Sequence, residues 1–104
     1  MSDNGLYVAE RKIYYSDKGR AERNNLTIRV TKPYAVDPQT VNFDTGNGVS
    51  ACKVCIHGID MESFEVYGAD DLQAVHLASN IESLLRRISK NYDLFWLSGE
   101  PYFE

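Results

Sequence analysis

The residues of this chain that could carry out chemistry gather around Cys52 and Cys55, which have C-x-x-C spacing, with His57 two residues further on. Such a pair works in redox chemistry when it lies at a helix N-terminus, where the thiol pKa is lowered. The surrounding pattern here is that of a strand, so the two sulfurs are expected on opposite faces of a sheet. His57 and His76 would bring the number of zinc ligands to four. A metal-binding or redox domain is therefore one alternative interpretation.

The sequence shows no other pattern of a catalytic or nucleotide-binding site. It contains no G-x-G-x-x-G, no G-x-x-x-x-G-K-[ST] and no H-E-x-x-H motif. Its two histidines have no spacing that places either beside a nucleophile or a carboxylate. We therefore expect a non-catalytic protein with no cofactor and no metal.

Length and charge set further limits. The 104 residues suit a single domain over 1–104. The net charge is −4, with seven bases and four acids in residues 1–36 against four bases and eleven acids in residues 37–104. An acidic chain argues against nucleic acid as the partner, because phosphate binding depends on clustered lysine and arginine. The N-terminus has no apolar leader and no run is long enough to span a membrane, so we expect a cytoplasmic protein.

Most of the expected elements are strands. Alternating or β-branched segments, bounded by glycine, proline and asparagine, predict four strands: Leu6 to Tyr15, Leu26 to Thr31, Val49 to His57 and Phe64 to Tyr67. The segment from Ser16 to Asn25 is expected to be a hairpin loop, and Pro33 to Gly48 a long connection. Leu94 to Leu97 is a candidate fifth strand at an edge, with either Leu94 and Trp96 or Phe95 and Leu97 facing inward.

One amphipathic helix is predicted from Asp70 to Asn91. At 100° per residue its apolar side chains form one stripe, consisting of Ala74, Leu77, Ala78, Ile81, Leu84, Leu85, Ile88 and Tyr92. Asp70 and Gln73 have the spacing of a capping box, and Glu82 can pair with Arg86 one turn later. The predicted fold is therefore α+β: an antiparallel meander of four or five strands packed against one long amphipathic C-terminal helix.

The sequence also favours a role in binding other proteins. It holds seven tyrosines, a residue type enriched in interfaces. Leu72 and Val75 fall outside the buried stripe of the helix, where they could be offered to a partner. The long connection from Pro33 to Gly48 is a second candidate, because long loops often carry function. The residues expected to contact a partner are Tyr34, Asp37, Asp44, Leu72 and Val75. An acidic surface suits a basic protein domain as the partner, and a homodimer is a further alternative.

The C-terminal half resembles a family of short uncharacterised bacterial proteins. The matching segments are Cys52 to Ile59, read as C-x-[apolar]-x-I-x-G-[apolar], and Gly68 to Ala78, read as G-x-D-[SD]-L-Q-A-[LV]-x-L-A. Leu94 to Gly99 looks like the closing Leu-x-Trp segment of that family. The resemblance implies the fold and no catalytic residue. Small acidic proteins of this kind also look like immunity proteins, which neutralise a toxin domain by covering its active site.

Overall fold

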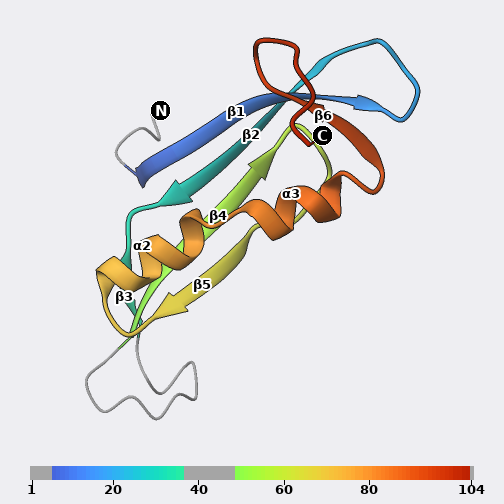
Figure 1. Ribbon diagram of the computed structural model, residues 1–104. Helices are drawn as coiled ribbons and strands as arrows, with labels where there is room; N and C mark the ends of the chain where they lie inside the picture. The colour runs from blue at the N-terminus through green and yellow to red at the C-terminus, as the bar shows by residue number, and fades with distance from the viewer. Residues whose placement is uncertain (1–5, 37–48, 104) are drawn as a thin grey trace.

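The computed structural model describes residues 6–36 and 49–103, which form an antiparallel sheet with two helices on one side of it (Figure 1). The strands are β1 (Tyr7–Asp17), β2 (Asn24–Thr31), β3 (Tyr34–Val36), β4 (Val49–His57), β5 (Phe64–Gly68) and β6 (Tyr92–Phe95). The helices are α2 (Asp71–Ser79) and α3 (Glu82–Ile88). The predicted α+β class is confirmed.

The sheet has six strands, where the sequence predicted four or five. β1 pairs with β2, β2 with β4, and β4 with β5, all antiparallel, in the order of the predicted meander. β6 does not extend this meander beyond β5. It pairs instead with β1, placing Leu94 opposite Tyr15, so the two ends of the described chain meet in the sheet.

The prediction that Pro33 to Gly48 is entirely a connection is wrong in its first residues. β3 lies there and pairs with β4, with Tyr34 opposite Ala51. β2 and β3 thus pair with β4 one after the other, along the same edge of β4. Pro33 interrupts this pairing, because it has no backbone N–H to donate. The Thr31 hydroxyl accepts a hydrogen bond from the Lys53 backbone N–H (2.8 Å) at this interruption.

The single long helix predicted from Asp70 to Asn91 is broken at Asn80 and Ile81 into α2 and α3. Serine and asparagine side chains compete for nearby backbone groups, and both stand at this break. Leu77, predicted to be buried, is 44% exposed, because α2 turns Ala74 and Ala78 toward the sheet. Tyr92 belongs to β6 and not to the helical stripe, and the helices are not C-terminal because β6 follows them.

The start of α2 agrees with its predicted capping box. The Asp70 carboxylate accepts from the Gln73 backbone N–H (2.8 Å), and the Gln73 side chain accepts from the Ala69 N–H (2.6 Å). The first bond satisfies a donor that the first turn of a helix leaves without a partner, and the second satisfies the backbone N–H of the residue before the N-cap. The predicted ion pair between Glu82 and Arg86 also forms, at 3.4 Å.

The core lies between the helices and one face of the sheet. Its buried side chains come from β1, β2, β4, β6 and both helices, and they are Ile13, Leu26, Ile28, Val30, Cys52, Val54, Ile56, Ala74, Ala78, Ile81, Leu84, Leu85, Ile88 and Leu94. Ala74 and Ala78 are fully buried, as predicted for a helix that approaches the sheet closely. Gly68 makes this approach possible, because a Cβ atom there would lie 2.5 Å from the Ala74 backbone nitrogen.

Candidate protein-binding surface

One face of the sheet packs against the helices, and neither helix covers the other face (Figure 1). Residues paired across strands point to the same side of a sheet, and successive residues alternate. Since Cys52 and Ile28 face the helices, Lys53 and Arg29 face away from them. We call this second side the open face. Its described side chains include Tyr7, Glu10, Lys12, Tyr14, Thr27, Arg29, Tyr34, Lys53, Cys55, His57, Glu65, Tyr67 and Phe95.

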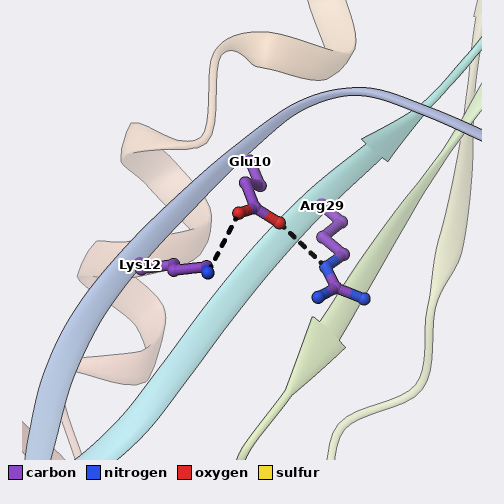
Figure 2. Close-up of polar contacts among 3 residues, drawn as sticks. All are labelled: Glu10, Lys12 and Arg29. Carbon is purple, nitrogen blue, oxygen red and sulfur yellow. Dashed lines mark hydrogen bonds and ion pairs between the residues drawn. The ribbon is translucent and has the colours of Figure 1, made fainter. Parts of the chain in front are cut away.

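An ion-pair network lies in the middle of the open face. The Glu10 carboxylate on β1 accepts from the Arg29 Nε–H on β2 at 3.0 Å, and it lies 3.4 Å from the Lys12 ammonium (Figure 2). Desolvation pushes the pKa of Glu10 upward, but hydrogen bonds from Arg29 and Lys12 outweigh it and hold that pKa below its usual value. The network joins two long cationic side chains to one carboxylate at the surface.

A second cluster joins two tyrosines to one carboxylate. The Tyr34 hydroxyl on β3 and the Tyr67 hydroxyl on β5 both donate to Glu65, the latter at 3.3 Å. Desolvation and then the Glu65 carboxylate raise the pKa of both phenols, which favours the protonated donors. Tyr34 and Tyr67 also flank Ala51 from opposite sides. Both rings are thus held in one position.

Arginine side chains also contact aromatic rings at the open face. The Arg29 guanidinium lies 5.2 Å from the centre of the Tyr7 ring, and the Arg23 guanidinium lies 3.3 Å from that of Phe95. Arginine stacks well on aromatic rings because its charge is planar and weakly hydrated. These contacts orient both the rings and the cations.

The cysteine and histidine residues are not brought together. Cys52 faces the helices and is buried, whereas Cys55 and His57 lie on the open face, and His76 is exposed on α2. Burial and then the nearby Asp71 carboxylate raise the pKa of the Cys52 thiol, which disfavours the reactive thiolate. Within residues 6–36 and 49–103, no three His, Cys, Asp or Glu residues form a group suited to a metal ion.

The predicted partner-binding residues lie in different places. Tyr34 is on the open face and 38% exposed, and Leu72 on α2 is 80% exposed. Val75 is half-buried and packs against the core. Asp37 and Asp44 lie outside the described residues.

The residue pairs that organise the open face have no signal in the sequence. The alternation of Thr27, Arg29 and Thr31 showed that these residues share a face. It did not show that Glu10 lies opposite Arg29, because this depends on the register between β1 and β2. The interruption at Pro33, which brings Tyr34 beside β4, had no clear signal either.

In the described part of the chain, every helix is too short or too polar to cross a membrane. No protein-family model matches the chain. Comparison with curated proteins and with solved structures likewise gives no match.

Proposed function

We propose that this chain is a non-catalytic protein-binding domain and that the open face contacts its partner. The observation that carries the proposal is a sheet face left uncovered by the helices that nevertheless displays five aromatic side chains, namely Tyr7, Tyr14, Tyr34, Tyr67 and Phe95. When one face of an antiparallel sheet contacts only water, polar side chains normally occupy that face and apolar side chains point toward the core. Tyrosine, phenylalanine and arginine are the residues enriched where proteins bind one another.

Contacts among the side chains of the open face add support. Binding loses less conformational entropy when the side chains at the interface already have partners. Glu10 holds Arg29 and Lys12, while Glu65 accepts from Tyr34 and Tyr67. A partner that covers these side chains therefore loses little side-chain entropy on binding.

The charge of the open face indicates what the partner offers. Three carboxylates, Glu10, Glu65 and Asp93, stand against five basic side chains on or beside this face, which are Lys12, Lys18, Arg23, Arg29 and Lys53. We expect a partner surface with apolar contacts and several carboxylates. A basic toxin domain, expected from the net charge of the whole chain, suits this face less well. An immunity role is a narrower form of the proposal, supported only by size and acidity, and a neighbouring toxin gene would favour it.

The test is capture of a partner from the source cell, followed by affinity measurement with the purified pair. A double variant, Lys12→Ser with Tyr14→Ser, removes two open-face side chains that lie outside the core. Truncating interface tyrosines typically weakens binding by about tenfold or more. Leu72→Ser is the control for the other side of the sheet, because Leu72 is also predicted to contact a partner and its side chain is 80% exposed on α2.

The expected result is strong binding by the wild type and the control and at least tenfold weaker binding by the double variant. Equal binding by all three proteins would rule out the open face as the contact surface. Loss of binding in the control alone would place the contact on α2, near Leu72.

A further inference from the structure

The N-terminal half of β1 is exposed on both faces and along one edge. Residues 8–12 are all exposed, although the neighbouring strand β2 buries every second residue. β6 pairs only with Tyr14 to Asp17 of β1, and no other described strand lies on that side of β1 (Figure 1). The edge from Val8 to Lys12 is therefore uncovered in the part of the chain that the structure describes.

The backbone groups of Glu10 and Lys12 point out of this edge. The Tyr102 N–H donates to the Leu94 carbonyl (2.9 Å), so Leu94 turns its backbone away from β1. The next residue of β6 therefore turns toward β1 and bonds to Tyr14. Backbone direction alternates along a strand, so Lys12 and Glu10 turn to the same side as Tyr14, where no described residue pairs with them. The edge thus presents N–H donors and carbonyl acceptors at alternate residues.

This edge is shielded only at its start. Proteins usually protect exposed edges from other strands, often with an irregularity in the pairing. The register between β1 and β2 shifts between Tyr7 and Ala9, whereas Glu10 and Lys12 lie beyond the shift in regular register. Their side chains stand on the open face, where they form an ion pair at 3.4 Å, and do not cover the edge. Another strand can therefore approach these two residues.

A small pocket lies beside this edge, on the helix side of β1. Its volume is about 130 Å³, comparable to an apolar cavity of roughly 150 Å³ that holds one benzene molecule. The lining is mostly apolar and consists of Ala9, Glu10, Arg11, Ile28, Val30, Ser79 and Ile81. The Ala9 side chain is a single methyl group. A longer apolar side chain on a strand beyond β1 can therefore lean across Ala9 into the pocket.

The Arg11 guanidinium lies next to this pocket without a counter-charge. It donates to the Tyr102 hydroxyl at 2.6 Å and lies 5.5 Å from the centre of the Trp96 ring. Among residues 6–36 and 49–103 it forms no ion pair. Arg11 and Ala9 are two residues apart on the same face, so the positions opposite them on an added strand are two residues apart as well. One of these positions lies beside the pocket and the other beside a cation.

We infer that the edge of β1 binds an extended segment of the partner as an added strand, in line with β6. The inference rests on the proposed function and specifies how the partner is held. Backbone hydrogen bonds to Glu10 and Lys12 supply affinity, while the pocket and Arg11 select the sequence. The segment carries an apolar residue that enters the pocket and, two positions away, an aspartate or glutamate that pairs with Arg11. This agrees with the carboxylates expected on the partner from the charge of the open face, which borders the edge.

Selection of random peptides displayed on phage, with the wild-type chain immobilised, supplies a ligand for the test. The enriched sequences are expected to share an apolar residue and an aspartate or glutamate two positions apart. Failure to enrich such sequences overturns the inference. The most enriched peptide is then made synthetically, and its affinity for each variant is measured by fluorescence polarisation.

A matched pair of variants at Lys12 tests the backbone contact. Lys12→Pro removes an N–H that points out of the edge and is expected to weaken peptide binding about tenfold or more. Lys12→Ala removes the same side chain but keeps the N–H, so it is expected to bind the peptide as the wild type does.

Amide hydrogen exchange keeps the outcome clear if Lys12→Pro perturbs the fold. In the wild type, the Glu10 and Lys12 amides are expected to exchange rapidly and to become protected when the peptide binds. The Arg11 amide faces β2 and is expected to exchange slowly in both states. Slow exchange at Glu10 and Lys12 without peptide overturns the inference, because a second copy of the chain then covers the edge.

The outcomes separate this inference from the proposed function. Equal peptide binding by Lys12→Pro and Lys12→Ala, with no protection of the Glu10 and Lys12 amides, overturns the inference even if the open-face double variant loses its captured partner. Peptide binding at the edge of a chain that captures no partner from the source cell supports the edge as a binding site and refutes the proposed function.

Discussion

Replacing Gly68 by alanine tests how closely α2 must approach β5. A Cβ atom at this position would lie 2.5 Å from the Ala74 nitrogen and 2.9 Å from both the Ala74 Cα and the Gln73 carbonyl carbon. Outside their own residue and its chain neighbours, real Cβ atoms essentially never lie within 3.0 Å of another heavy atom. All three neighbours are backbone atoms, so no side chain can rotate away. The start of α2 must move off the sheet.

The size of the effect follows from this displacement. The start of α2 must move about 0.5 Å or more away from β5 to relieve the contact. A gap of that size loses roughly a quarter of the dispersion energy of the atoms that line it. Ala74 and Ala78 are fully buried and lose contacts with β4 and β5 together. Overpacking of a core typically costs about 1–3 kcal/mol. We expect Gly68→Ala to lower the free energy of unfolding by about 3 kcal/mol, the upper end of this range.

Urea denaturation followed by circular dichroism measures this loss. Gly19→Ala is the matched control, because Gly19 has a φ of +78° but no atom lies within 4 Å of the position that an alanine methyl group would take, so only backbone strain is added. That strain costs about 1 kcal/mol. The reasoning is refuted if Gly68→Ala is no more destabilising than Gly19→Ala.

Three further outcomes are expected. Ser16→Ala should leave stability unchanged or raise it by up to about 1 kcal/mol in urea denaturation, since the buried Ser16 hydroxyl has no hydrogen-bond partner among the described residues; a clear loss would contradict this. Alkylation of the native protein, mapped by mass spectrometry, should modify Cys55 well before Cys52, because burial and then Asp71 raise the pKa of the Cys52 thiol; equal rates would refute it. Because folding raises the pKa of Tyr34 above its ordinary value of 10.0, the unfolded chain loses this proton first. The free energy of unfolding should therefore fall as the pH rises above about 10, and less steeply in Tyr34→Phe.

Local patterns were enough to locate most of the elements. The alternation of Leu26, Ile28 and Val30 reports burial directly, and the spacing of Asp70 and Gln73 reports a helix start, because both depend only on near neighbours along the chain. The same holds for the buried alanines of α2. These features could be predicted because the two-residue repeat of a strand and the helical repeat of buried residues are both visible in the sequence.

Features that depend on distant partners could not be predicted in this way. Leu77 fits the helical stripe, yet it is 44% exposed, because α2 packs on the sheet through Ala74 and Ala78. Tyr34 follows a proline in a segment without alternation, yet β4 supplies the hydrogen bonds that make it a strand. The contact between Glu10 and Arg29 likewise depends on strand register, so the open face became visible only in three dimensions.

The pairing of β6 with β1 also sets the order in which this chain can fold during synthesis. β1 leaves the ribosome well before its second neighbour, β6. Contacts between residues so far apart in the chain form slowly, because a long loop must close before they gain any energy. Until Tyr92–Phe95 has emerged, one edge of β1 stays open to strands of other nascent chains. Pairing with β6 therefore closes its part of this edge of β1 to other chains.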